Sequence, residues 1–269
     1  MNNGLKNKVR SLQRLLYFLL YSGNHHRIHS PFLYAFIGDV IRKDRAVEGG
    51  DKIEQIRHEC FKSSEIVNKT DYGTGGKNPR GMNYPVALSQ IAKTSLTSPR
   101  YARRLYHLVI NMKASTMLEI GSSLGFTTAY LALANPNARI ITLEGCPELC
   151  RKAREHYNRI GISNIEVMEG RFEETLPVAL EKLGTVDLIY LDGNHHKESM
   201  LKYYEQCQTH INTKTVMVLD DIHASKGMEE AWDLIRARQE VRISLDLFYT
   251  GWLFYRKESS RQHFRLRYL

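Results

Sequence analysis

Apolar and polar residues alternate in blocks along the part of the chain that follows residue 115. Short, almost continuously apolar runs recur there, and each is followed by a longer stretch in which apolar residues return every three or four positions. The first pattern predicts buried strands and the second predicts amphipathic helices. The predicted strands are 116–120, 139–143, 164–168, 186–191 and 215–219, and the predicted helices are 126–134, 147–160, 173–183, 197–210 and 226–238.

Strands that alternate with helices in this way predict a parallel sheet covered on both faces. The end of the region differs, because VRISLDLFY (241–249) and GWLFYRK (251–257) are both strand-like and meet at Thr250 and Gly251. Two strand-like runs joined by so short a turn predict a hairpin. The sequence therefore predicts an α/β fold with a doubly wound parallel sheet that finishes in an antiparallel hairpin.

The first 114 residues are predicted to be mostly helical, with a last helix over about 98–113. Residues 71–85 hold four glycines and two prolines, which predicts a loop. We expect three parts: a helical, basic extension over 1–83 with this Gly-rich loop, a main domain over 84–257, and a basic tail over 258–269.

The charge of the chain is unevenly spread around a net value of +9. Residues 115–255 carry 14 Lys and Arg against 20 Asp and Glu, residues 1–114 carry 19 against 8, and residues 256–269 carry 5 against 1. Basic flanks attract nucleic acid, anionic lipid or an acidic substrate, and they also occur on ordinary solvated helices. The absence of an aromatic-basic RNA-binding motif slightly favours the solvated surface.

Composition places the chain among ordinary globular proteins, since 42% of its residues are hydrophobic and 25% are charged. No apolar run approaches the roughly 18–20 residues of a membrane span. The run LLYFLLYSG (15–23) follows basic residues, but no small-residue cleavage site follows it, which argues against export. The four cysteines lack zinc-site spacing, so we expect reduced thiols and a cytoplasmic protein.

Candidate chemistry begins at the turn MLEIGSSLG (117–125), which lies between a predicted strand and a predicted helix. The pattern G-x-G-x-x-G that cradles a pyrophosphate is missing, because Ser122 and Ser123 separate Gly121 from the next glycine, Gly125. Glu119 adds a carboxylate, which repels pyrophosphate and suits a cationic ligand. S-adenosylmethionine carries an ammonium and a sulfonium and no phosphate, so this turn favours it over a dinucleotide.

Two later strand ends strengthen this interpretation. Glu144 ends the second predicted strand 23 positions after Gly121, where an acid accepts hydrogen bonds from the ribose hydroxyls. The run VMEGRFEETLP ends the third strand and turns at Gly170, and an adenine ring there would lie against Arg171 or Phe172. Phe172 is equally consistent with an anchor of the next helix.

Three aspartates follow the next two strands. Asp192 ends the fourth strand, and Asp220 and Asp221 end the fifth, so their carboxylates should converge at one sheet edge. Clustered carboxylates suit Mg²⁺, Mn²⁺ or Ca²⁺, and a metal-bound hydroxyl has a lowered pKa. His195 and His223 lie beside these acids and are candidate general bases. The alternative is that Asp221 caps a turn and the histidines are solvated.

The series LEIGSSLG, LEG, MEGRFEE, YLDGNHHKE and LDDIH, followed by a hairpin, resembles the class I S-adenosylmethionine-dependent methyltransferases over roughly residues 84–257. YLDGNHHKE and LDDIH are most similar to the catechol O-methyltransferase-like branch, and the whole chain is similar to bacterial methyltransferases of unassigned substrate. The resemblance implies a Rossmann-like seven-stranded sheet in the order 3-2-1-4-5-7-6, with strand seven antiparallel.

The resemblance also implies roles for individual residues. Glu119, Gly121 and Gly125 would line the methionine part of the cofactor, Glu144 would hold the ribose, and Arg171 or Phe172 would neighbour the adenine. Candidate cofactor residues are therefore Glu119, Gly121, Ser122, Ser123, Gly125, Glu144, Gly145, Gly170, Arg171, Phe172 and Asp192. Candidate catalytic residues are Asp192, His195 and His223. Candidate ligands of Mg²⁺ or Mn²⁺ are Asp192, Asp220 and Asp221.

The implied activity is O-methyl transfer to a small-molecule hydroxyl. Whether a divalent metal assists this transfer stays open. In the catechol branch the third metal ligand is an asparagine amide, and Asp221 in its place leaves metal dependence open. Two alternatives stay open as well: an RNA methyltransferase that uses the basic flanks, and a catalytically silent cofactor-binding protein. A nicotinamide oxidoreductase is disfavoured by the missing glycines.

Overall fold

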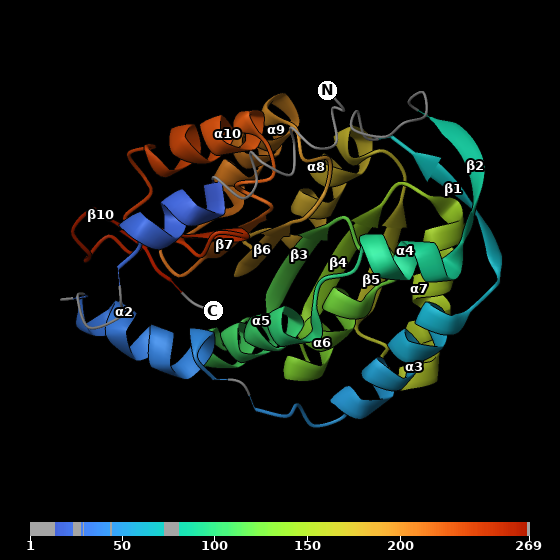
Figure 1. Cartoon of the computed structure of the whole chain (residues 1–269). Helices are drawn as coiled ribbons and strands as arrows, with labels where there is room; N and C mark the ends of the chain where they lie inside the picture. Colours follow the sequence, from blue (N-terminus) through green and yellow to red (C-terminus); the bar gives the residue numbers. More distant parts are fainter. Residues whose placement is uncertain (1–13, 24–27, 29, 44, 73–80, 268–269) are drawn as a thin grey trace.

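The computed structural model describes residues 14–23, 28, 30–43, 45–72 and 81–267. An eight-stranded sheet lies at the centre, and helices cover both of its faces (Figure 1). The strands of this sheet are β3 (Thr116–Ile120), β4 (Arg139–Glu144), β5 (Ile165–Glu169), β6 (Leu188–Leu191), β7 (Val216–Asp220), β8 (Ile243–Asp246), β9 (Thr250–Phe254) and β10 (Gln262–Arg265).

The helices of the main domain follow these strands in the alternation that the sequence predicts. They are α6 (Phe126–Ala134), α7 (Pro147–Ile160), α8 (Phe172–Leu183), α9 (Lys197–Cys207) with a 3₁₀ turn at Gln208–His210, and α10 (Lys226–Arg236). The earlier helices are residues 14–21, α2 (Pro31–Phe36) with a π-helical turn at Ile37–Ile41, α3 (Gly50–Lys62), α4 (Leu88–Thr94) and α5 (Pro99–Met112). No helix within the described ranges is long and apolar enough to cross a membrane.

The sheet has the order β10-β8-β9-β7-β6-β3-β4-β5. Strands β3 to β7 are parallel to one another, and β9 is antiparallel to both of its neighbours, β7 and β8. The predicted α/β class and its closing antiparallel hairpin are therefore confirmed.

Both faces of the central strands are buried, so alternate residues enter different cores. Along β3, Met117 packs with α2, α5 and α6 on one face, and Leu118 packs with α8, α9 and α10 on the other. Neither side chain has any exposed surface. This double burial explains the nearly unbroken apolar runs of the strands, since a parallel sheet has no solvated face.

The prediction of seven strands is wrong by one, because the basic tail contributes β10. This strand runs parallel to β8, from Gln262 opposite Ile243 to Arg265 opposite Asp246. It is four residues long and only Phe264 joins the apolar core. A strand this short and polar has no hydrophobic pattern of its own, so only its pairing with β8 reveals it.

The predicted helical extension is also wrong in part, because it contains an antiparallel hairpin of β1 (Ile66–Asp71) and β2 (Met82–Ala87). Residues 82–85 were expected to be loop and are strand, while the Gly-rich residues 73–80 lie outside the described part of the chain. Val67 is fully buried among α3, α4 and α7, so tertiary packing stabilises a hairpin that local propensity disfavours.

Candidate active site

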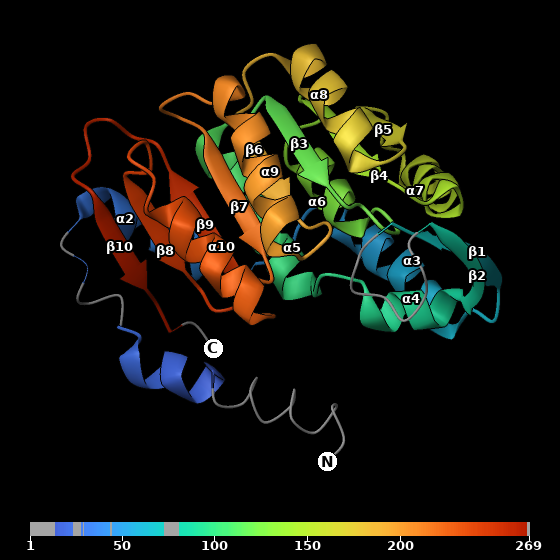
Figure 2. The same ribbon diagram turned by 90° about the horizontal axis from the view of Figure 1, so that it is seen from above.

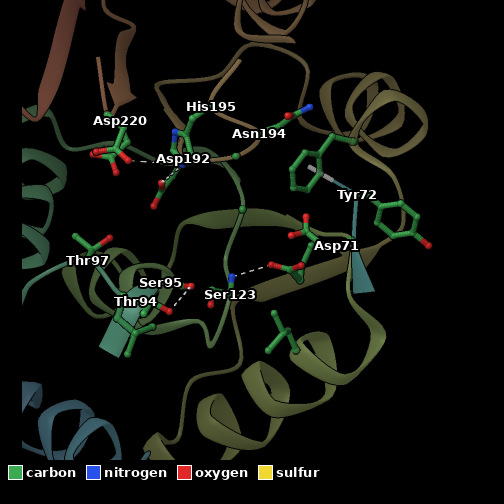
Figure 3. Close-up of a pocket in the computed structure, with 18 of the residues that line it drawn as sticks. Asp71, Tyr72, Thr94, Ser95, Thr97, Ser123, Asp192, Asn194, His195 and Asp220 are labelled. Atoms are coloured by element: carbon green, nitrogen blue, oxygen red, sulfur yellow. Dashed lines mark hydrogen bonds and ion pairs between the residues drawn. The ribbon is translucent and has the colours of Figure 1, made fainter. Parts of the chain in front are cut away.

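A cavity of about 1060 Å³ lies at the carboxyl edge of the parallel strands (Figure 3). Its floor is formed by the turn after β3, the end of β4 and the loops after β5, β6 and β7. Its other wall comes from the end of β1 and the connection between α4 and α5. The carboxyl edge of an open parallel sheet is where such folds bind ligands.

The turn after β3 presents two of its predicted residues, Gly121 and Ser123, to the cavity. Both have positive φ, 93° and 49° respectively. A Cβ on Gly121 would lie 2.3 Å from the carbonyl oxygen of Asp192, so glycine is required by the approach of the loop after β6. The glycine therefore joins the turn to the loop that carries the acidic residues.

Glu144 ends β4, lines the cavity and is 9% exposed. Its Oε2 accepts a hydrogen bond from the Ser123 amide at 2.8 Å, and its Oε1 accepts one from the Cys146 amide at 2.9 Å. Burial raises the pKa of this carboxyl, and the two hydrogen bonds from the backbone amides oppose that rise. Glu144 is thus held rigidly at the cavity wall beside the turn.

Glu119 occupies a different place from the predicted one. It has no exposed surface and lies under the turn, outside the cavity lining. Its Oε2 accepts hydrogen bonds from the hydroxyls of Thr128 and, at 2.6 Å, Thr142. Burial raises the pKa of Glu119 to about 7. The Glu119 side chain therefore packs beneath the turn and supports it, because the side chain is directed into the interior of the protein and does not reach the surface.

Three other predicted cofactor residues also stand outside the cavity lining: Ser122, Gly125 and Gly170. Ser122 is 5% exposed, and a Cβ on Gly125 would lie 2.4 Å from the Tyr157 hydroxyl. Gly125 is therefore required by the packing of α7 against the start of α6. These residues shape the turn without reaching the cavity.

Gly145, Arg171 and Phe172 line the end of the cavity formed by the turns after β4 and β5. Phe172 also packs against Tyr203 with ring centroids 6.1 Å apart, so it is both a cavity wall and an anchor of α8. Tyr72 covers this end from β1, since a Cβ on Gly145 would lie 2.8 Å from its ring. The hairpin thus brings an aromatic ring over the end of β4.

The loops after β6 and β7 bring Asp192, Asp220 and Asp221 to the cavity together with His195 (Figure 3). The Tyr190 hydroxyl donates to Asp192 Oδ2 at 3.1 Å. Burial raises the pKa of Asp192 well above its usual range, and the neighbouring charge of Asp220 raises it further. Burial raises the pKa of Asp220 to about 7. The two side chains share a hydrogen bond that favours a proton on Asp192.

His195 is the histidine closest to these acids. Its Nε2 lies 3.7 Å from Asp192 Oδ1 and 4.0 Å from Asp221 Oδ2. Burial lowers the pKa of His195, and the charge of Asp221 works against that shift. A lowered pKa keeps the imidazole neutral near pH 7, which is the form that accepts a proton.

His223, the other candidate base, faces away from the cavity. Its Nε2 lies 3.0 Å from Asp246 Oδ2, and its Nδ1 lies 3.1 Å from Glu229 Oε1. Although burial opposes the charged ring, these two carboxylates raise its pKa. A histidine paired on both nitrogens and outside the cavity lining cannot deprotonate a ligand there. This pairing favours His195 over His223 as the general base, and both assignments stay predictions.

The three aspartates offer oxygen donors that suit Mg²⁺ or Mn²⁺, but their arrangement does not fit a metal ion. Within the described ranges, no group of three or more His, Cys, Asp and Glu side chains is arranged to hold one. Asp192 and Asp220 are hydrogen-bonded to each other, and Asp221 has a positive φ of 53° and a side chain that is 44% exposed. The predicted ligand set is thus not preassembled.

No sequence pattern predicted the wall that comes from the α4–α5 connection and the start of α5. It includes five residues with hydroxyl groups and two arginines: Thr94, Ser95, Thr97, Ser98, Tyr101, Arg100 and Arg104. Tyr101 is 9% exposed, and burial together with the charge of Asp220 raises its pKa. Ser98 followed by Pro99 did signal a helix start, but not that this helix would face the cavity.

Comparisons with known proteins agree with this geometry. Residues 118–222 match a family model described as a methyltransferase domain. The chain is 30% identical over 137 residues to a catechol O-methyltransferase of Mycobacterium tuberculosis and 29% identical over 128 residues to one of Niastella koreensis. These matches cover 49% and 46% of this chain, and 60% and 57% of the relatives. The chain thus spans less than two thirds of the curated relatives that it matches.

A solved structure extends the likeness of fold beyond the matched sequence. The O-methyltransferase from Bacillus cereus in complex with SAH superposes with a TM-score of 0.56 at 18% identity, and the alignment covers 82% of this chain and 96% of that one. The shared sheet places the motif-bearing loops of this chain at the edge where the cavity lies. Residues 118–222 therefore match a methyltransferase domain, and the chain as a whole shares its fold with a solved O-methyltransferase.

Proposed function

We propose that this protein transfers the methyl group of S-adenosylmethionine to a hydroxyl of a small-molecule acceptor. One observation carries the proposal: the turn with Gly121, the Glu144 carboxylate and the Asp192–His195 pair all line a single cavity. An acid for the ribose stands at one end, and a neutral imidazole stands at the other. The catechol O-methyltransferase relatives support a hydroxyl acceptor.

The cofactor end is assigned from contacts on the cavity wall. Glu144 is fixed by two amides and would accept hydrogen bonds from the ribose hydroxyls. Arg171, Phe172 and Tyr72 would enclose the adenine. The acids after β6 and β7 would lie near the sulfonium, whose positive charge favours that position.

The reaction needs the acceptor oxygen in line with the bond between the methyl carbon and the sulfur. His195 Nε2 would take the hydroxyl proton as the oxygen–methyl bond forms and the sulfur–methyl bond breaks, which releases S-adenosylhomocysteine. The resulting imidazolium would lie within about 4 Å of the Asp221 carboxylate, whose charge stabilises it. His195 is thus the proposed general base.

Assistance by Mg²⁺ or Mn²⁺ at Asp192, Asp220 and Asp221 stays a prediction. A metal bound there would polarise the acceptor hydroxyl, but the hydrogen-bonded carboxyl pair does not fit one as it stands. The mechanism above therefore uses only side chains of this chain. Exhaustive chelation separates the two routes, because a reaction that depends on His195 alone survives it.

We expect S-adenosylhomocysteine to raise the melting temperature of the protein and NAD not to. Ligand at about 100 times its dissociation constant adds roughly 2.7 kcal/mol to the free energy of unfolding. For a domain of this size the shift is roughly 5–10 °C. A melting shift with NAD and none with S-adenosylhomocysteine would contradict the cofactor assignment. Binding without methyl transfer to any member of a phenol, catechol and alcohol panel would favour the silent cofactor-binding protein.

Replacing Glu144 should weaken cofactor binding and also lower the stability of the fold, because one of the two backbone amides loses its acceptor oxygen. Glu144→Gln removes the charge from the hydrogen bonds to the ribose, which costs about 1.5–3 kcal/mol, or roughly a 10- to 150-fold rise in Kd. Isothermal titration with S-adenosylhomocysteine measures this change. Glu169→Gln is the matched control, because Glu169 ends the neighbouring strand β5 and lies outside the cavity lining. Equal affinity of Glu144→Gln and parent would remove Glu144 from the site.

The RNA methyltransferase remains a second hypothesis, which rests on the basic flanks of the sequence. Binding to RNA through phosphates weakens steeply as salt rises. Methyl transfer to an RNA substrate with such a salt dependence, and none to the hydroxyl panel, would favour it.

A further inference from the structure

The helix at residues 14–21 has one face docked on the protein and one face open. On the docked face, Phe18 is 5% exposed and packs against Phe248 with ring centroids 5.2 Å apart. Arg14 Nε lies 3.0 Å from Glu229 Oε1 on α10. These contacts fix which side of the helix points outward.

The open face consists of four large apolar or aromatic side chains at helical spacing. Leu16 is 52% exposed, Tyr17 56%, Leu20 79% and Tyr21 66%. Positions i, i+1, i+4 and i+5 share one side of a helix, so these four form a continuous stripe. We call this stripe the open face. Contiguous exposed apolar surface of this kind marks an interaction site.

Tertiary structure brings Arg265 and Arg267 of the C-terminal flank to the described N-terminal segment that carries the open face. The Gly23 amide donates to the Arg265 carbonyl at 2.9 Å, and the Arg267 amide donates to the Gly23 carbonyl at 3.2 Å. The N-terminal segment therefore pairs with the end of β10 (Figure 2). The guanidinium of Arg265 lies over the Tyr17 ring, 5.8 Å from its centroid. No acidic residue precedes Asp39 in the sequence.

We propose that the open face and the arginines beside it, Arg265 and Arg267, form a docking surface for an anionic lipid membrane. Leucines of an interfacial helix enter the boundary of the acyl chains, and tyrosines prefer the level of the headgroups. Lys and Arg beside them are attracted to negatively charged lipid. The helix would lie on the membrane plane, since its described residues, 14–21, are too few to cross a membrane.

Two other occupants agree less well with these residues. A second copy of the chain docked through the same face would bring two basic segments together, and like charges repel. RNA would meet the positive charge, but Leu16 and Leu20 have no ring on which a base can stack. Only a lipid surface uses both the aliphatic side chains and the charge.

Docking would also hold the acceptor end of the cavity close to the lipid. Phe248, which contacts Phe18, is followed by Tyr249, and Tyr249 lines the cavity. The Tyr249 carbonyl accepts from the Ile222 amide, one residue after Asp221. The docked face of the helix and the loops after β7 and β8 are therefore neighbours, although the docking itself is independent of the proposed activity.

Vesicle sedimentation of the whole chain tests the proposal. The parent should bind vesicles that contain phosphatidylglycerol, bind pure phosphatidylcholine much more weakly, and lose affinity as salt rises. The double variant Leu16→Ser and Leu20→Ser should bind the anionic vesicles at least about tenfold more weakly, because it lacks the two leucines that would be buried in the lipid. Ile66→Ser is the matched control, since Ile66 is 60% exposed on the β1–β2 hairpin, far from the helix (Figure 2).

The controls and outcomes separate docking from misfolding and from other partners. The double variant should keep the parent's melting temperature, because both leucines are exposed. Absence of parent binding to the anionic vesicles would overturn the proposal, and so would equal binding of parent and double variant. A dimer in sedimentation equilibrium that the double variant loses, without vesicle binding, would assign the face to a second copy. Binding of a single-stranded RNA oligonucleotide in place of vesicles would assign it to nucleic acid.

Discussion

Replacing His195 with alanine should reduce kcat by roughly 10²- to 10⁴-fold, the range expected for loss of a general base. His195 Nε2 is near two carboxylates, and burial lowers the pKa of the ring, so the parent holds a neutral imidazole at the acceptor end of the cavity. Initial rates with a hydroxyl acceptor that the parent methylates, followed by release of S-adenosylhomocysteine, measure the change.

His58→Ala is the matched control for this variant. His58 lies on α3, is exposed and stands outside the cavity lining, so its loss should leave the rate unchanged. The affinity of His195→Ala for S-adenosylhomocysteine should stay within a few-fold of the parent, because the proposed role concerns the acceptor. Retention of most of the activity in His195→Ala would remove the histidine from the mechanism.

Asp192→Ala is expected to lower methyl transfer by at least about a hundredfold while it spares cofactor affinity. Loss of a preorganised electrostatic partner in a dry site typically has an effect of that size. Asp192 is the hydrogen-bond partner of Asp220 and lies 3.7 Å from His195, so its removal disturbs both the charge and the orientation of the acceptor end. Comparison of kcat with the Kd for S-adenosylhomocysteine separates the two roles.

The companion variant Tyr190→Phe tests how Asp192 acts. It removes the hydroxyl that donates to Asp192 Oδ2 and leaves the carboxyl in place. We expect a smaller loss of rate than in Asp192→Ala, since only the orientation of the acid changes. Loss of cofactor binding in Asp192→Ala would place this acid in the cofactor pocket and overturn the assignment of roles.

Sequence patterns were sufficient to predict the central sheet and the candidate site residues at the carboxyl ends of its strands. Buried parallel strands must be apolar along their length, so β3 to β7 are visible as apolar runs. The runs of β4, β6 and β7 each have an acidic residue at the carboxyl end, and this pattern predicted Glu144, Asp192 and Asp220 as site residues. The same rule predicted that Glu119 lines the cofactor site. Glu119 lies before the end of its strand, and its side chain is buried beneath the turn that follows.

Short and polar elements escaped prediction because their stability comes from partners distant in sequence. β10 needs β8, and the β1–β2 hairpin needs α3, α4 and α7. Neither has a hydrophobic pattern strong enough to identify it alone. The consequences reach the site, since the hairpin places Tyr72 over Gly145 and the α4–α5 connection supplies a wall of the cavity.

The sequence by itself determined the fold class, the turn after β3 and the acidic residues at the strand ends, because buried strands require local apolar runs and the polar residues that follow each run mark its end. Only the tertiary structure distinguishes the two histidines, which look alike in sequence: His195 lines the cavity, whereas His223 is paired with Asp246 and Glu229 outside the cavity lining. It also joined Gly23 to Arg265 at the end of β10. Pairing between residues more than 200 positions apart depends on the assembled sheet, and no local pattern encodes it.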